Sequence, residues 1–140
     1  MGPWSAFGLD CLLEAPRKFL DGKLITSVTA LSPVAAPGVA MAHVARTPRD
    51  KPIVAVAVRV THTSQPLGDV CIALAGVADR PVRAYDAEQR LKGGPFEQHL
   101  VDEALAVALK NVNVPSDFRG SDEYRRAMAA VLTGRALLEV

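Results

Sequence analysis

A small set of polar side chains could support chemistry in this chain. His43, Arg59, Tyr85 and Tyr124 are candidates for polar groups in an apolar pocket. Histidine can exchange a proton near neutral pH, and arginine can hold an anion through a fork of N–H donors. No serine lies in a sequence context typical of a nucleophile. The catalytic residues are therefore unassigned, and an enzyme built on these four candidates would work without a cofactor.

The residues that usually bind metals or cofactors are too few or wrongly spaced. No two of the histidines His43, His62 and His99 lie four residues apart, as two ligands on one helix face would. Cys11 and Cys71 are too few for an iron–sulfur cluster, which takes four thiolates, and we interpret them as buried or half-buried thiols. Glycine-rich phosphate-binding motifs are absent. The sequence thus predicts no metal site and no cofactor bound by this chain alone.

Length and charge exclude several classes of protein. The chain has 140 residues, of which 49% are hydrophobic, enough for the core of one domain. Its 16 basic and 15 acidic residues nearly cancel, whereas a nucleic-acid or membrane-surface partner usually requires a basic excess. No segment is long and apolar enough to span a bilayer, and the first residues lack the basic start of a signal peptide. We therefore expect a cytoplasmic protein with neither nucleic-acid nor membrane partners.

The first half of the chain reads as a sheet. Apolar residues alternate with others over 24–30, 39–46, 53–62 and 70–74, as on the two faces of a strand. The clearest of these segments is 53–62, where every second residue is a valine: Val54, Val56, Val58 and Val60. Short loops between the segments favour antiparallel neighbours. Residues 1–21 are less regular and are predicted to form an N-terminal arm.

The second half reads as helices. Pro81 suits the first turn of one helix, which Gly93-Gly94 would end, and Pro95 can open a second. A third begins near Ser121, a good N-cap. Its predicted inner stripe consists of Tyr124, Ala127, Met128, Val131, Leu132 and Leu138. The predicted fold of residues 22–140 is therefore α+β: a small antiparallel sheet of three to four strands packed against about three C-terminal helices.

The start of the last helix is unusually rich in charge. Arg119 could bridge Asp117 and the acidic first turn, and Ser121 would cap the helix. We expect this cluster to be mainly structural, with Tyr124 buried and Arg125 on the polar side of the helix. The alternative is a docking surface in which the tyrosine and the arginines are anchors, because both types are enriched at interfaces.

The same segment carries a family resemblance. Residues 117–126 resemble the D-x-R-x-S-x-x-Y-R-R signature of the C-terminal domain of the FAD-binding subunit of molybdenum hydroxylases, the carbon monoxide dehydrogenase and xanthine dehydrogenase group. Residues 76–84 resemble the family's G-x-A-x-x-P-x-R-A turn. Residues 53–58 and 22–26 resemble its central and first strands, so that the resemblance extends from Gly22 to the end.

The resemblance implies a fold, cofactors and partners. In the family this domain is an α+β sandwich that follows two domains binding most of the FAD, and those domains have no counterpart in this sequence. FAD, iron–sulfur and molybdopterin groups would then belong to partner chains. Where the family often has a basic residue near the flavin, this sequence has His43 and Val44.

Two functions follow from this resemblance. The first is a structural or assembly role in an oxidoreductase complex, as a stand-alone module of a flavin subunit. The second is a freestanding copy recruited to bind, or to transform, a small organic molecule between sheet and helices. Loss of the family's neighbouring domains would expose a covered surface, so we also expect a homodimer, formed through residues 4–13 and one face of the sheet.

Overall fold

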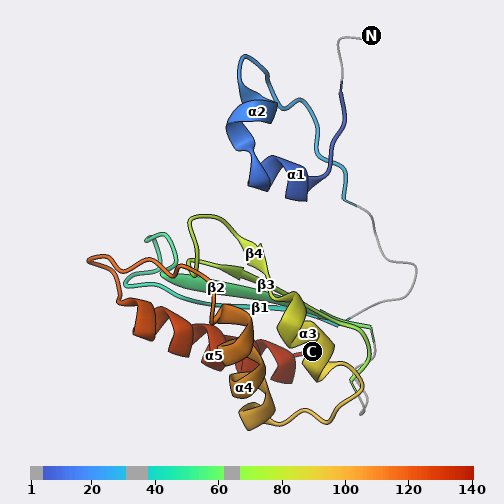
Figure 1. Ribbon diagram of the computed structural model, residues 1–140, viewed down its shortest axis with the longest axis vertical. Coiled ribbons are helices and arrows are strands. Elements are labelled where there is room, and N and C mark those ends of the chain that lie inside the picture. Colours follow the sequence, from blue (N-terminus) through green and yellow to red (C-terminus); the bar gives the residue numbers. More distant parts are fainter. Residues whose placement is uncertain (1–4, 31–37, 62–66) are drawn as a thin grey trace. The chain divides into compact units, whose positions relative to one another are not determined.

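The computed structural model describes residues 5–30, 38–61 and 67–140 (Figure 1). The chain divides into two compact units, Met1–Ser32 and Pro33–Val140. The division into an arm of residues 1–21 and a domain of residues 22–140 stays a prediction.

The first unit contains two short helices, α1 (Leu9–Glu14) and α2 (Pro16–Leu20). Neither helix buries a residue, and the rings of Phe7 and Phe19 lie 4.8 Å apart between centroids. The strand predicted over 24–30 is wrong: residues 23–30 lie in neither helix nor strand. An alternating pattern makes a strand only where a second strand supplies hydrogen bonds, and none pairs with this described segment. Trp4, part of the predicted arm, lies outside the described residues.

The second unit is built on a four-stranded sheet in the order β1-β2-β3-β4. Its strands are β1 (Gly38–Val44), β2 (Val54–Val60), β3 (Val70–Ala75) and β4 (Val82–Arg83), and each neighbouring pair is antiparallel. The α+β prediction and its antiparallel sheet are confirmed. The segments 39–46 and 53–62 were each predicted slightly too long at their C-terminal ends, and His62 lies outside the described residues.

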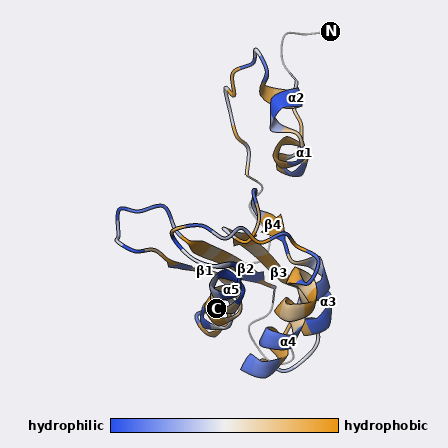
Figure 2. Ribbon diagram, turned by 60° about the vertical axis from the view of Figure 1, so that its left-hand side comes forward, coloured by the Kyte–Doolittle hydropathy of each residue, from blue (hydrophilic) through white to orange (hydrophobic). Residues whose placement is uncertain are grey.

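Three helices cover one face of this sheet: α3 (Tyr85–Leu91), α4 (Gln98–Leu109) and α5 (Asp122–Leu138). Figure 2 shows all three on the same side, with α5 beneath β1 and with α4 and α3 following. The other face carries no helix of this unit. We call it the outer sheet face, and its residues are Val39, Met41, His43, Ala55, Ala57, Arg59, Cys71, Ala73, Ala75 and Arg83.

The helix boundaries correct one prediction. Pro81 does not open a helix but stands just before β4, where Val82 pairs with Leu74 of β3. A proline is tolerated there because the start of an edge strand does not need its N–H. Helix α3 ends two residues before Gly93, which has φ +74°, so the predicted helix end is confirmed. Helix α4 begins at Gln98, three residues after Pro95.

The core fills the space between the sheet and the helices. All four alternating valines of β2 are buried, as predicted. They meet Ile72 and Leu74 from β3 and a set of apolar helix residues: Ala87, Leu91, Val101, Ala104, Leu105, Leu109, Ala129, Leu132, Ala136 and Leu137. Small and medium side chains dominate this core, because β-branched and alanine residues pack closely on a pleated surface.

The inner face of α5 differs from the prediction. Of the six residues predicted to face inward, only Leu132 is buried, and Tyr124 is 39% exposed. The buried positions on this helix are Arg125, Ala129, Leu132, Thr133, Gly134, Ala136 and Leu137. The helix is thus turned by about one residue, roughly 100°, from the orientation that its apolar pattern predicts. The prediction was wrong because it placed every polar residue of the helix on the solvent side, whereas Arg125 and Thr133 are buried on the inner face.

Candidate functional site

Arg125, the residue predicted to face solvent, is the most buried charged group of the described structure, at 1% exposure. Its guanidinium donates hydrogen bonds to the carbonyl oxygens of Ile53 at 2.7 Å, Gly76 at 2.9 Å and Gly120 at 3.3 Å. It also donates to Asp117 Oδ1 at 2.7 Å. A buried charge is stable only when it is paired and hydrogen-bonded, and these four contacts meet that requirement. Arg125 thereby ties the start of α5 to β2 and to the turn after β3.

Asp117 completes this network from the loop before α5. The backbone N–H of Arg119 donates to its Oδ1 at 2.9 Å, and the Arg119 guanidinium donates to Oδ2 at 2.9 Å. The hydrogen bonds from Arg119, and then that from Arg125, hold the pKa of the Asp117 carboxyl well below its usual value near 4. Ser121 Oγ accepts from the N–H of Tyr124 and caps α5. This geometry supports a structural role for the charged segment.

Gly76 explains why this network needs a glycine at the turn after β3. Its φ is +84°, and a Cβ at this position would lie 2.0 Å from the carbonyl oxygen of Ile53. Only glycine allows so close an approach. The two carbonyl oxygens of Ile53 and Gly76 are thereby brought together around one guanidinium nitrogen of Arg125. The motifs at residues 76–84 and 117–126 therefore meet in space.

A second polar cluster lies on the outer sheet face. Arg59 on β2 pairs in register with Cys71 on β3, and its guanidinium lies 2.9 Å from Cys71 Sγ. Arg83 on β4 approaches the same sulfur at 3.1 Å. Both arginines are exposed, and the thiol is half-buried. Two guanidinium groups therefore converge over one thiol on a face that no helix of this unit covers. We call Arg59, Cys71 and Arg83 the arginine–cysteine cluster.

Glu88 on α3 anchors this cluster from beneath. This carboxylate is 4% exposed and accepts from Arg83 Nε at 2.8 Å and from Arg83 Nη2 at 2.9 Å. Its Oε1 also accepts the backbone N–H of Ile72 at 2.8 Å, while the N–H of Ala84 donates to the Ile72 carbonyl oxygen where the chain leaves β4 for α3. The hydrogen bond to Glu88 raises the pKa of Arg83 above its usual value. The Arg83 guanidinium lies 4.5 Å from the centre of the Tyr85 ring, which fixes its orientation further.

The four candidates from the sequence do not form one site. Arg59 is part of the arginine–cysteine cluster, and Tyr85 contacts this cluster through Arg83. His43 lies on the same face, but four residues along β1 from the position in register with Arg59, a distance of about 13 Å. Tyr124 lies on α5, in the layer that covers the opposite face.

Sequence reasoning missed Cys71, Arg83 and Glu88. Two signals could have found the first two: the alternation of β3 places Cys71 opposite the buried Ile72, and Arg83 is the arginine of the 76–84 motif. Glu88 gave no signal, because a carboxylate on an expected amphipathic helix is usually solvated. Glu88 is buried because it accepts the N–H of Ile72, which no strand residue of the described structure accepts. This arrangement is visible only in the structure.

The chemistry of the arginine–cysteine cluster is that of anion recognition. Arginine donors pair with carboxylate or phosphate oxygens, and Arg59 has no carboxylate within salt-bridge distance among the described residues. Over residues 5–30, 38–61 and 67–140, no group of three or more histidine, cysteine, aspartate or glutamate side chains could hold a metal ion. A thiol between two guanidinium groups is also a poor ligand for a cation, because the neighbouring charges repel it.

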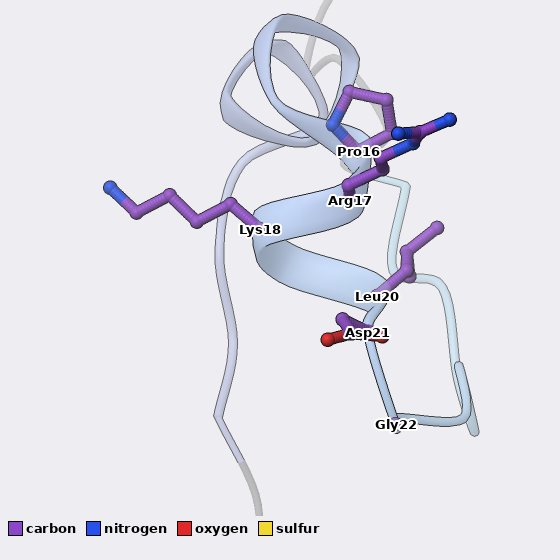
Figure 3. A pocket seen from close by; sticks show the side chains of 6 residues that line it. All are labelled: Pro16, Arg17, Lys18, Leu20, Asp21 and Gly22. Carbon is purple, nitrogen blue, oxygen red and sulfur yellow. The ribbon is translucent and has the colours of Figure 1, made fainter.

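Two hollows are found on the surface, and neither lies between the sheet and the helices. One, of about 760 Å³, lies around α2 and is lined by Pro16, Arg17, Lys18, Leu20, Asp21 and Gly22 (Figure 3). The side chains of Arg17 and Lys18 point away from one another in this view, so that they do not converge on a common ligand. The other hollow, of about 120 Å³, is lined by six residues around Phe118 and is too small for a flavin. No helix in the described part of the chain has the length and apolarity that crossing a bilayer requires.

Comparison with known proteins identifies the family. Residues 40–140 match the family described as the CO dehydrogenase flavoprotein C-terminal domain. The glyceraldehyde dehydrogenase medium chain of Sulfolobus acidocaldarius is 34% identical over 97 residues, which are 69% of this chain and 34% of that protein. The carbon monoxide dehydrogenase medium chain of Afipia carboxidovorans is 32% identical over 116 residues, which are 83% of this chain and 40% of that protein.

Solved structures agree with these sequence matches. A reconstituted CO dehydrogenase from Oligotropha carboxidovorans superposes with a TM-score of 0.69 at 31% identity, over 78% of this chain and 38% of that chain. Quinoline 2-oxidoreductase from Pseudomonas putida 86 gives a TM-score of 0.67 at 25% identity, over 76% and 38% of the two chains. The chain thus spans well under half the length of these relatives. It belongs to the family of CO dehydrogenase flavoprotein C-terminal domains.

Proposed function

We propose that this chain acts as a C-terminal-type module of a molybdenum hydroxylase flavin subunit, with a structural or assembly role in an oxidoreductase complex. Its relatives are medium chains of such enzymes, and they are more than twice as long as the matched region. The chain therefore contributes packing surface, while FAD, iron–sulfur and molybdopterin groups are bound by partner polypeptides. By itself the chain binds no FAD.

The observation that carries this proposal is the outer sheet face, which no helix among the described residues of the second unit covers. Its centre consists of small side chains, Ala57 and Ala73 among them, and its margin carries Met41 at 70% exposure. The guanidinium groups of Arg59 and Arg83 stand on the same face. A flat apolar surface beside arginine anchors is typical of an interface rather than of a surface in contact with water. A flavin-carrying polypeptide with carboxylates at its edge would complement it.

The alternative, a small organic molecule bound between sheet and helices, has less support. The valines of β2 and the leucines of α3 and α4 fill that space in the described structure, and those valines are at most 1% exposed. A ligand there would have to displace core side chains, which costs more than a preformed pocket does.

Purification of the tagged chain from the cells that naturally express it would test the assembly role. We expect it to co-purify with polypeptides that carry flavin, iron and molybdenum, detected by absorbance and elemental analysis. Replacement of Arg59 by Glu should release these partners, whereas Arg90→Glu, at an exposed position of α3, should retain them. A chain that purifies without partners, or a chain made alone in a heterologous host that binds stoichiometric FAD, would contradict the proposal.

A further inference from the structure

The outer edge of β1 is the first of two surfaces that no other described element of the second unit covers. The N–H of Thr61 donates to the carbonyl oxygen of Asp69, so the odd-numbered residues of β2 bond toward β3 and the even-numbered ones toward β1. Because Ala40 pairs with Val58, the backbone N–H and C=O groups of Val39 and Met41 point away from the sheet. The same holds for His43. Among the described residues, no strand pairs with this edge.

This edge lacks the features that usually prevent edge-to-edge pairing. Natural edge strands are commonly short, or carry lysine, proline or a bulge. Strand β1 is seven residues long, and its sequence, GVAMAHV, contains no proline and no lysine, arginine or carboxylate. Its side chains at Val39 and Met41 are 63% and 70% exposed. An edge of this kind is a template for another strand.

The second surface is a flank of α5. Arg126 donates to the carbonyl oxygens of Leu109 and Val112 at the end of α4. The side of α5 that carries Arg126 therefore faces α4. Tyr124 lies two residues earlier, about 200° around the helix, and therefore faces away from α4. Met128 and Val131 follow at helical spacing on the same flank, both half-buried.

The two surfaces are neighbours. Helix α5 packs beneath β1 and β2, and it is the outermost helix of the layer, with α4 and α3 on its other side (Figure 2). The flank that points away from α4 therefore runs below the free edge of β1. Tyr124, Met128 and Val131 were predicted to belong to the buried stripe of α5. In the structure these three residues form its partly exposed flank instead. We call β1 and the residues Tyr124, Met128 and Val131 the edge surface.

We propose that the edge surface binds a second copy of this chain, so that two sheets join through β1 into one antiparallel sheet of eight strands. A two-fold axis at Met41 pairs this residue with Met41 of the second copy, and Val39 with His43 of the second copy. All outward N–H and C=O groups of these three residues are then satisfied, because antiparallel strands exchange both bonds at such pairs. The proposal goes beyond the assembly role, since it leaves the outer sheet face free.

Charge and size favour a copy over an unrelated partner. The same two-fold axis places the two α5 helices antiparallel, which brings the acidic first turn of one, with Glu123, toward Arg135 in the last turn of the other. Stable interfaces bury about 1,600 Å² in total, more than one pair of seven-residue strands supplies. The apolar flank of α5 contributes the additional area.

Sedimentation analysis of the full chain tests the proposal. We expect a dimer at micromolar concentrations. The substitution Met41→Pro removes an outward N–H without breaking the bonds between β1 and β2, and it should weaken dimerisation at least about tenfold. Tyr124→Glu should do the same while preserving α5, because a glutamate three residues after the Ser121 cap favours the helix. Val107→Glu, a comparably exposed site on α4 at 42%, is the matched control and should leave the dimer unchanged.

Disulfide trapping tests the predicted register. In the proposed pair the Cα atoms of the two Met41 residues lie about 5.5 Å apart, within the range of a disulfide. Oxidised Met41→Cys should therefore form a covalent dimer. Ala73→Cys, in the same register row but two strands away, should not. A monomeric parent chain, a dimer unaffected by both Met41→Pro and Tyr124→Glu, or equal cross-linking at both cysteines would overturn the proposal. None of these results depends on a flavin-carrying partner, so each is separate from failure of the assembly role.

Discussion

Two arginine clusters of this domain differ in what surrounds the guanidinium. Arg125 is 1% exposed and is surrounded by three carbonyl oxygens and one carboxylate of its own chain. Arg59, on the outer sheet face, is exposed, and its hydrogen bond within the described structure goes to a thiol. The fold of the chain supplies Arg125 with four oxygen acceptors, whereas it supplies Arg59 with a thiol alone among the described residues. The comparison teaches that arginine content alone does not identify an interface: the acceptors already occupied decide which arginine is structural.

The largest effect is expected from the buried cluster. Arg125→Met retains a long side chain but removes the donor to three backbone carbonyl oxygens and one of the donors to Asp117. A buried acceptor that loses its donor typically costs about 1–3 kcal/mol, so several together should cost about 3–5 kcal/mol. We expect a loss of this size in the free energy of unfolding, measured by urea denaturation. Arg90→Met, at an exposed position in the last turn of α3, should change it by less than about 0.5 kcal/mol. Equal effects of both substitutions would show that burial does not separate the two classes of arginine.

Glu88 provides an intermediate case, since it is a buried carboxylate that supports an exposed arginine. Glu88→Ala removes the acceptor of the Ile72 N–H and the partner of Arg83. An unsatisfied buried donor and a lost charged hydrogen bond together should cost about 2–3 kcal/mol. Thermal unfolding would measure this, with Glu103→Ala on the exposed side of α4 as the control. A melting temperature equal to that of the parent chain would mean that water replaces Glu88 at the edge of β3.

The buried cluster should also give the domain an acid-sensitive stability. Asp117 has a folded-state pKa depressed below its unfolded value near 4, so its contribution is fully present above that value and is lost as the pH falls below it. The melting temperature of the parent chain should therefore decrease from pH 5 to pH 2. Asp117→Asn should be less stable at pH 5 and should show a smaller decrease over the same range. Parallel curves for the two proteins would exclude Asp117 as a source of the acid sensitivity.

The sequence predicted the sheet better than the helix that packs on it, for a physical reason. Alternation in β2 was decisive, because a strand has two faces and only one of them was apolar throughout. Helix α5 was misoriented because its buried face carries Arg125 and Thr133, which the apolar pattern excluded. The arginine is tolerated only because the turn at Gly76, distant in sequence, supplies a carbonyl oxygen. Such long-range compensation has no local signal.

Sequence reasoning predicted a wrong strand at residues 24–30 and did not predict the arginine–cysteine cluster, and the two errors have related causes. The apolar alternation of 24–30 is real, but a strand also needs a neighbour, and pairing is not visible in one segment. Arg59 was singled out as a candidate, yet Cys71 and Arg83 join it only through the register of three strands. Register depends on turns and on packing across the whole sheet. Residue types could therefore be predicted, but their grouping could not.

Tyr124 is far less buried than Arg125 on the same helix. At 39% exposure it retains part of its ring in contact with the domain, so Tyr124→Ala should cost about 1–2 kcal/mol in the isolated monomer, below the 3–5 kcal/mol of a fully buried aromatic residue. Chemical denaturation at protein concentrations low enough to keep the chain monomeric would measure this. A cost as large as that of Arg125→Met would mean that the ring is packed more tightly than its exposure indicates.

The smallest effect on stability is expected at Arg59. The Arg59 side chain is exposed, and its described hydrogen bond goes to a thiol, which is a weak acceptor. Arg59→Ala should therefore change the free energy of unfolding by less than about 0.5 kcal/mol, as surface substitutions usually do. If the outer sheet face docks a flavin-carrying polypeptide, the same substitution should weaken that complex by about tenfold or more, because arginine anchors at interfaces often contribute over 1 kcal/mol. Urea denaturation and a pull-down of the native complex measure the two quantities in the same variant. A variant that loses stability but retains its partners would assign Arg59 to the fold, as Arg125 is, and would remove the distinction between the two clusters.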